Sequence, residues 1–353
     1  MTVWALHLQL SSGTTPPEPA VRRYRPGHYL AIGNNNSQRD SYTDELTWPG
    51  NQGVQFRYRW VDIEPTQDNY TAKPILDDLE IISNVTTARG KKDAQLIAML
   101  EDKSFLPNPT PLPVYMQPYS SPNARGTTVW RWDPYVVERW AKLIKFLGPF
   151  VDNHPNFAGF AVQETSMSFG ASPGHGYTDL KYRDSIISAL LSMTSATPHA
   201  VAYWYHNYMP APATDFRLDE IITACKGKGV IMGGPDILPE SDELEKRVYP
   251  RYRTKGYGQL PMFCSCQHDS YDHVHQSNYA ADNFGLTGYT WSNGDYWTME
   301  QLYAWATTTN ARSIHVQTVI WEVRATGPND VTDSKAVMAK FPTWTVAGAD
   351  NTP

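Results

Sequence analysis

Phe157-Ala-Gly-Phe-Ala-Val-Gln163 is an apolar run that ends abruptly in a polar residue. A helical pattern follows over Asp179–Met193, and a second apolar and aromatic run follows over Ala200–Tyr205. Strand, amphipathic helix and strand in this order predict a βαβ unit, in which the two strands are parallel. Thr178 suits the N-cap of the helix, because its hydroxyl can accept a hydrogen bond from the first turn.

The same alternation extends over the whole chain. Eight strand candidates are present: His28–Gly33, Val54–Trp60, Ala94–Leu100, Phe157–Gln163, Ala200–Tyr205, Gly229–Gly234, Pro261–Cys266 and Ile314–Trp321. The clear helical patterns are Ala72–Ala88, Pro134–Phe150, Asp179–Met193, Asp215–Cys225, Ser241–Tyr252 and Met299–Asn310, with Asp133 and Thr298 as further N-caps. An open doubly wound sheet usually carries a glycine-rich phosphate turn after its first strand. Here Gly33 is followed by asparagines, so the sequence predicts a closed (β/α)8 barrel, the TIM-barrel fold.

The chain of 353 residues is predicted to form one domain over residues 1–353, because α/β barrels of this length are commonly single units. Residues 332–353 are polar and turn-rich, and we expect them to form a loosely docked tail. Leu106–Arg131 and Asp272–Trp297 each follow a strand. They should therefore be long loops on the C-terminal face of the barrel, where active sites form.

The composition argues against several classes of function. The net charge is -6 and the basic residues are scattered, which argues against a nucleic-acid partner. No apolar run is long enough for a membrane span, and the segment after Met1 has no signal-peptide pattern. Three cysteines are too few for a disulfide framework, and Cys264 and Cys266 should pack on the same side of a strand. The 12 Trp and 21 Tyr include candidates for flat surfaces on which sugar rings stack.

Most strand candidates end in a carboxylate. These residues are Asp62, Glu64, Glu101, Asp102, Glu164, Asp236, Asp269 and Glu322. A barrel enzyme takes its catalytic groups from the C-terminal ends of its strands. Glu164 is the strongest candidate, because it emerges from an apolar strand whose low-dielectric wall disfavours the ionised form and suits a proton donor. Gln163 beside it could hydrogen-bond a sugar hydroxyl.

Trp60, Ile63-Glu-Pro65 and Tyr70 together resemble the segment that leads from the second strand into the second helix of clan A glycoside hydrolases. The glycine of that motif corresponds to Asn69 here. The fourth strand is similar as well, since the acid/base glutamate of the clan closes it, although the clan has Asn where this chain has Gln163. Trp321 resembles the tryptophan of the clan's eighth strand that lines the subsite at the cleaved bond. The resemblance implies a retaining glycosidase that acts on a poly- or oligosaccharide without a cofactor or metal, and we expect such an enzyme to be secreted or periplasmic.

Strand seven departs from the clan, whose nucleophile is a glutamate at the end of that strand. Cys264-Ser-Cys-Gln-His-Asp269 contains no glutamate. Glu322, just after Trp321, is our first candidate for the second carboxylate, followed by Asp269 and then Asp236. Arg324 is expected to lie beside Glu322 and to favour its carboxylate form. The predicted catalytic residues are therefore Glu164 and Glu322, and the predicted substrate-binding residues are Trp60, Asp102, Gln163, Tyr205, Asn207, Asp236, Gln267, His268, Asp269 and Trp321.

Two other functions stay open at this point. His273 and His275, with an aspartate nearby, are compatible with a metal-dependent barrel hydrolase of amides or esters. A carbohydrate-binding barrel without catalytic activity is the second alternative. Ser166 and Ser168 lack the turn of a nucleophile elbow, which argues against a serine hydrolase.

Overall fold

The computed structural model describes residues 22–32, 42–88, 94–104, 110–122, 126–167, 173–207, 215–235, 239, 244–256, 258–266, 298–308, 314, 316–322 and 331–342. Among them, eight parallel strands form one sheet in the order β8-β7-β6-β3-β2-β1-β10-β9. These strands are β1 (Gly27–Ile32), β2 (Asn51–Arg59), β3 (Gln95–Glu101), β6 (Phe157–Val162), β7 (Val201–Tyr205), β8 (Val230–Gly233), β9 (Phe263–Cys266) and β10 (Thr318–Glu322). All eight lie where the sequence predicted a strand.

The two ends of this sheet meet and close the barrel. Met232 of β8 forms a parallel bridge with Met262, and its N–H donates to the Pro261 carbonyl at 2.9 Å. The N–H of Ser265 in β9 donates to the Gly234 carbonyl at 2.9 Å. The predicted (β/α)8 barrel is therefore confirmed, and a doubly wound sheet is excluded.

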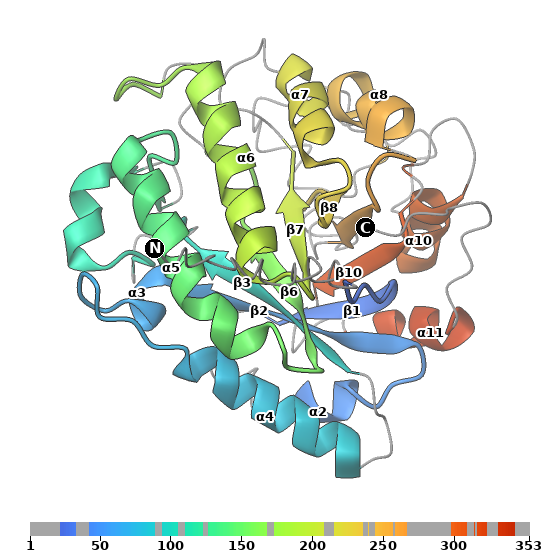
Figure 1. Cartoon of the computed structure of the whole chain (residues 1–353). Coiled ribbons are helices and arrows are strands. Elements are labelled where there is room, and N and C mark those ends of the chain that lie inside the picture. Colours follow the sequence, from blue (N-terminus) through green and yellow to red (C-terminus); the bar gives the residue numbers. More distant parts are fainter. Residues whose placement is uncertain are drawn as a thin grey trace, which may run out of the picture.

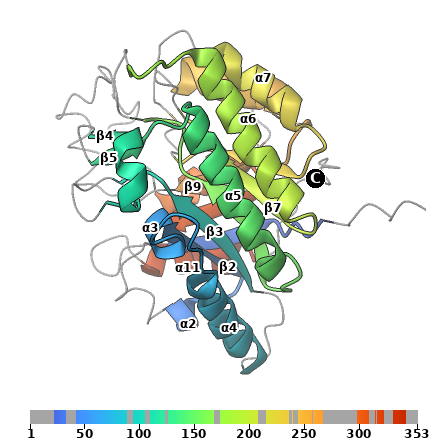
Figure 2. The ribbon, with the colours of Figure 1, turned by 60° about the vertical axis from the view of Figure 1, so that its left-hand side comes forward.

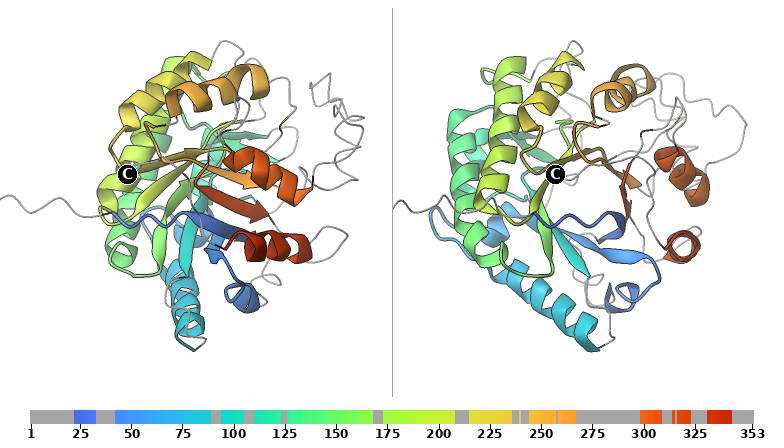
Figure 3. Two further views of the ribbon diagram at one scale, coloured as in Figure 1. Left: turned by 90° about the vertical axis from the view of Figure 1, so that its right-hand side faces the viewer. Right: turned by 45° about the vertical axis from the view of Figure 1, so that its right-hand side comes forward.

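Helices surround the strands on the outside of the barrel (Figure 1, Figure 3). They are α2 (Tyr42–Glu45), α3 (Trp60–Ile63), α4 (Lys73–Ala88), α5 (Pro134–Val151), α6 (Asp179–Ala196), α7 (Asp215–Cys225), α8 (Tyr249–Arg251) between the turns η2 (Leu244–Val248) and η3 (Tyr252–Gly256), α10 (Met299–Thr307) and α11 (Val331–Lys340). The predicted N-caps are confirmed, since Asp133, Thr178 and Thr298 each accept a hydrogen bond from the first turn of α5, α6 and α10. Helices α5 and α6 pack side by side against the strands (Figure 2).

The loop predicted over residues 106–131 contains a short ordered structure. A 3-10 helix, η1 (Val114–Tyr119), leads into a hairpin of β4 (Ser120–Pro122) and β5 (Thr127–Val129). The hairpin is bonded to the end of β3, because the N–H of Ser104 donates to the Thr127 carbonyl at 2.8 Å and Val129 donates to the Asp102 carbonyl at 3.3 Å. This part of the rim is thereby fixed beside the end of β3.

Alternation along the strands sorts the apolar side chains into two layers. One buried cluster fills the inside of the barrel: Tyr29, Ala31, Ile97, Met99, Ala158, Ala161, Val201, Tyr203, Tyr205, Ile231, Phe263 and Ile320. The other lies between the strands and the helices, and it includes Cys264 and Cys266 on one face of β9, as the sequence predicted. Polar residues that continue the inner set at the C-terminal ends of the strands therefore face the mouth of the barrel.

A bulge in β6 decides which of its side chains face inward. Phe157 and Phe160 belong to the outer layer, whereas Ala158 and Ala161 belong to the inner one. The pairing with β3 skips Ala158 and resumes at Gly159, which has φ 155. A Cβ at this position would lie 1.8 Å from the Val201 carbonyl oxygen, so only glycine fits.

The structure describes the tail predicted over residues 332–353 as far as residue 342. Helix α11 packs on the barrel with Met338 fully buried, and the Lys335 ammonium lies 5.3 Å from the ring centre of Trp48. Burial of an apolar stripe on this helix outweighs its polar composition. Residues 343–353 lie outside the described residues.

Candidate active site

Glu164 follows β6 at the C-terminal end of the barrel, and polar groups surround its carboxylate. The Lys103 ammonium donates to Oε1 at 2.6 Å, and the Asn207 side-chain amide donates to Oε2 at 2.6 Å. The Glu164 side chain keeps 14% of its surface exposed, whereas that of Lys103 keeps 1%. The apolar surroundings predicted for Glu164 are therefore wrong, because a buried cation and an amide from the neighbouring strands contact it.

Asn207, a predicted substrate-binding residue, holds the Glu164 segment. It follows β7 and is 4% exposed. Its side-chain oxygen accepts from the N–H of Ser166 at 3.0 Å and from the hydroxyl of Thr165 at 3.3 Å. Together with the hydrogen bond from the Asn207 side-chain amide to Glu164, these contacts hold the Glu164 carboxylate in position.

Gln163 and Asp102 are also committed to contacts within the protein. The side-chain oxygen of Gln163 accepts from the backbone N–H groups of Asp102 at 2.9 Å and Lys103 at 2.8 Å. Asp102 forms a two-point ion pair with Arg131 at 2.7 and 2.6 Å, and Arg131 also donates to the Glu164 carbonyl at 2.7 Å. Both predicted substrate ligands are nearly buried, at 3% and 4% exposed. They support Glu164.

Glu322 ends β10 on the inward face, because Ile320 two residues earlier lies in the inner cluster. Arg57 of β2 donates to its carboxylate at 3.5 Å, and the two side chains are 24% and 23% exposed. Burial opposes the charge of Arg57, but the carboxylates of Glu322 and Glu101 outweigh it and raise its pKa, with a smaller contribution from Glu164. Arg57 thus lies within electrostatic reach of both predicted catalytic carboxylates.

Tyr205 lies below this pair, at the top of the inner layer. Its ring packs edge-on against Phe263 at 4.6 Å between centres, and its hydroxyl donates to the side-chain oxygen of Gln55. It is 2% exposed. Burial raises the pKa of its hydroxyl, so Tyr205 stays neutral and acts as the floor of the mouth.

Trp60 and Trp321 do not face the mouth of the barrel, and the prediction that they line the cleft is wrong. They are 1% and 0% exposed and belong to the layer between strands and helices. The Trp321 indole N–H donates to His28 Nδ1 at 3.1 Å, and that of Trp60 donates to Glu64 at 2.8 Å. In β10 the strand alternation that turns Glu322 inward turns Trp321 outward.

Glu64, another strand-end carboxylate, has a structural role. It is fully buried and forms an ion pair with Arg139, which also binds Asp68 at 2.7 Å. Asp68 has φ 61, so the glycine of the clan A motif corresponds to Asp68 and not to Asn69. The motif therefore builds a buried network outside the barrel mouth.

The remaining predicted residues, Asp236, Gln267, His268 and Asp269, lie outside the described residues, as do Arg324 and the histidines 273 and 275. Sequence reasoning missed Lys103, Arg57 and Arg131. A signal for Arg57 was available, because Gln55, Arg57 and Arg59 alternate with apolar residues along β2. Within the described ranges, no group of three or more His, Cys, Asp or Glu side chains could hold a metal. No helix in those ranges has the length and apolar character of a membrane span.

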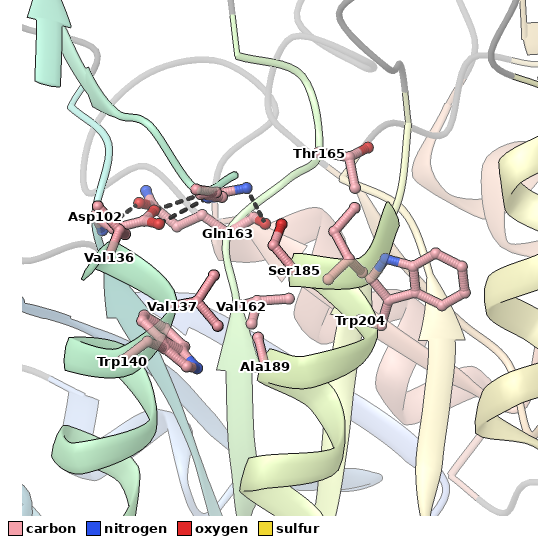
Figure 4. Close-up of a pocket in the computed structure, with 12 residues that line it drawn as sticks. Asp102, Val136, Val137, Trp140, Val162, Gln163, Thr165, Ser185, Ala189 and Trp204 are labelled. Atoms are coloured by element: carbon pink, nitrogen blue, oxygen red, sulfur yellow. Dashed lines mark hydrogen bonds and ion pairs between the residues drawn. The ribbon is translucent and has the colours of Figure 1, made fainter. Parts of the chain in front are cut away.

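A small cavity lies outside the barrel, between α5, α6 and the strands that they cover (Figure 4). It measures about 40 Å³ and is lined by α5, α6 and the strand residues Val162 and Trp204, with Asp102 and Gln163 at one end. Neither Glu164 nor Glu322 lines it. It belongs to the layer that supports Glu164 and not to the mouth.

No family model matches the sequence, and no curated protein matches it. Solved structures do match. A GH5_18 variant from Streptomyces cattleya in complex with Manβ1-4GlcNAc has a TM-score of 0.53 at 13% identity, over 90% of this chain and 80% of that chain. Endo-glycoceramidase II from Rhodococcus sp. has a TM-score of 0.52 at 10% identity, over 90% and 78%. The β-galactosidase from Halorubrum lacusprofundi has a TM-score of 0.55 at 9% identity, over 89% and 57%.

The chain has the barrel fold of these glycoside hydrolases. In this barrel, β6 is the fourth strand and β10 is the eighth. The strand count made from the sequence is confirmed, so Glu322 closes strand eight and not strand seven. The departure from the clan pattern at strand seven therefore stands.

Proposed function

We propose that the protein is a glycoside hydrolase of a poly- or oligosaccharide, with Glu164 as acid/base and Glu322 as the second carboxylate. One observation carries the proposal. Two partly exposed glutamates lie at the C-terminal ends of β6 and β10 of a barrel, and the Arg57 guanidinium contacts Glu322 at 3.5 Å and lies within electrostatic reach of Glu164. Sites of (β/α)8 enzymes form at this face.

The chemistry needs one carboxyl group that protonates the leaving oxygen and one that attacks the sugar carbon or activates water. Glu164 is held in place by Lys103 and Asn207, which suits a group that must meet one oxygen atom. Glu322 is 23% exposed and lies 3.5 Å from Arg57, which suits a carboxylate that an incoming sugar must reach. Retention requires carboxyl groups about 5–5.5 Å apart and inversion about 6.5–9.5 Å. Retention is our proposal, by analogy with clan A, and a secreted or periplasmic location stays a prediction.

The test is hydrolysis of a panel of aryl β-glycosides and β-linked disaccharides, among them Manβ1-4GlcNAc, with proton NMR of the first anomer released. We expect hydrolysis with retention by the wild type and none by Glu164→Gln/Glu322→Gln. The matched control is Glu138→Gln, an exposed glutamate of α5 that is paired with Lys142 at 2.8 Å outside the mouth. It should behave as the wild type.

The alternatives have distinct outcomes in the same experiment. Binding of an oligosaccharide without hydrolysis by the wild type would support the non-catalytic barrel. Ester or amide hydrolysis that requires added zinc would support the metal-dependent hydrolase. Hydrolysis by the double variant at the wild-type rate would exclude both proposed carboxylates.

A further inference from the structure

Lys103 is a buried lysine whose ammonium group is held by hydrogen bonds within the protein. Its Nζ donates to Glu164 Oε1 and to the Ser166 carbonyl, both at 2.6 Å, and its side chain is 1% exposed. Its backbone N–H is held by Gln163, and the residue bridges to Thr128 of the hairpin. The lysine and the predicted acid/base therefore form a fixed pair.

The neighbouring charges leave Glu164 as the counter-ion of Lys103. Asp102 also attracts Lys103, but both carboxylate oxygens of Asp102 accept hydrogen bonds from the Arg131 guanidinium. The other charged and titratable groups around the pair are Arg57 of β2, Glu101 of β3, Tyr182 of α6 and Glu322 of β10. Arg57 interacts with Glu322 and Glu101 more strongly than with Glu164. Burial lowers the pKa of the Lys103 ammonium, while Glu164 opposes this change.

We infer that Lys103 is a positioning residue that holds the catalytic proton of Glu164, so that the two side chains work as one acid. This inference rests on the proposed function. In the resting pair the proton is on Nζ. As the Glu322 carboxylate bonds to the sugar carbon, the bond from that carbon to the leaving oxygen breaks and its electron pair goes to that oxygen. The proton passes from Nζ to the Glu164 carboxyl group, which protonates the oxygen, and the ammonium becomes an amine.

The second half of the reaction restores the pair. Water attacks the sugar carbon as the bond from that carbon to Glu322 breaks, and the electron pair of that bond returns to the Glu322 carboxylate. The water proton goes to Glu164, and the Glu164 carboxyl group returns it to the Lys103 amine. No other reactant is required. The proton of such a pair is lost in a step that belongs to both groups, and not to a lone carboxyl group. We therefore expect the Lys103–Glu164 pair to keep its proton up to a higher pH than a glutamate alone would.

The test uses Lys103→Met, Lys103→Arg and the control Lys142→Met, which removes an exposed lysine paired with Glu138. For the sugar that the wild type cleaves, kcat/KM is measured against pH with the phenyl and the 2,4-dinitrophenyl glycosides. The dinitrophenyl group leaves with little need for a proton. Lys103→Arg keeps the positive charge but cannot release its proton, so we expect a loss of about 100-fold on the phenyl glycoside and less than about threefold on the dinitrophenyl glycoside. Lys103→Met should move the basic limb of the phenyl-glycoside profile down by about one pH unit or more.

A merely structural lysine gives a different result. Equal losses of Lys103→Arg on both glycosides, or a basic limb of Lys103→Met within about 0.3 pH units of the wild type, would overturn the inference. If Lys103→Met does not fold, the inference is tested by Lys103→Arg alone, from the ratio of its kcat/KM values on the two glycosides. A wild type that hydrolyses no sugar of the panel removes the proposed function and this inference with it. An active wild type whose Lys103→Arg variant loses equal activity on both glycosides removes the inference only.

Discussion

Glu164 and Glu322 differ in how closely neighbouring side chains hold their carboxylates. Glu164 accepts two hydrogen bonds of 2.6 Å, from Lys103 and Asn207, and is 14% exposed. Glu322 is 23% exposed and contacts Arg57 at 3.5 Å. Glu164 is supported by the hairpin, by Arg131 and by both neighbouring strands, whereas Glu322 keeps a larger share of its side chain exposed beside Arg57 of β2.

The difference fits two different tasks. A proton donor must be aimed at one atom, and fixed dipoles that need no reorganisation make such a group effective. A carboxylate that meets the sugar carbon must be reachable, and its charge needs only a nearby cation. Under the proposed function, the closely held Glu164 suits proton transfer and the more exposed Glu322 suits contact with the sugar.

The largest expected effect on activity concerns Glu322, the more exposed of the two carboxylates. Glu322→Ala should lower kcat by about 10⁴-fold or more, because the loss of a nucleophile removes a whole step of the reaction. Added azide or formate should restore part of the activity by occupying the vacated space, and an azide adduct of the sugar can be detected by mass spectrometry. If Asp269→Ala is the inactive and rescuable variant instead, the nucleophile lies after β9 and the comparison must be drawn with that residue.

Glu164→Gln, which changes the more closely held carboxylate, should have the next largest effect on activity. We expect a loss of about 10²–10⁴-fold on substrates with poor leaving groups, the usual contribution of general acid/base catalysis. The loss should be much smaller on dinitrophenyl glycosides, and the melting temperature should stay near that of the wild type. Activity within a factor of two of the wild type on every substrate is incompatible with the assignment.

Trp321→Ala tests whether the residue beside Glu322 belongs to the mouth or to the outer layer. Because the ring is fully buried between strands and helices, we expect a loss of about 3–5 kcal/mol of unfolding free energy. KM of the folded fraction should be unchanged, as measured at a temperature well below the transition. A raised KM with unchanged stability would place the ring in the substrate cleft, as the sequence first indicated.

Asn207→Ala should have the smallest effect of the series. The variant removes one of the two described donors on Glu164 and frees Thr165 and Ser166. We expect a decrease of about tenfold in kcat with little change in KM, because the group orients the acid and does not bind the sugar. A change confined to KM would make Asn207 a substrate ligand.

The barrel and its layers could be predicted from the sequence because strand alternation and helix periodicity are local signals. The strand count, the caps at Asp133, Thr178 and Thr298 and the positions of Glu164 and Glu322 at strand ends follow from them. The partners of these carboxylates could not be predicted, because Lys103 and Asn207 meet Glu164 only when separate strands are placed side by side. Trp321 was misassigned since the family resemblance carried no information on its orientation, which the inward position of Glu322 fixes.

The hydrogen bonds of His28 have a consequence for the growing chain. His28 of β1 accepts from Trp321 of β10, 293 residues later, and its other ring nitrogen lies 3.1 Å from the Phe341 carbonyl after α11. Strand β1 pairs with β2 on one side and with β10 on the other. A nascent chain therefore carries β1 with one open edge until β10 has left the ribosome. Open edges invite wrong partners and distant contacts slow folding, so synthesis of this barrel should depend on chaperones more than its final stability suggests.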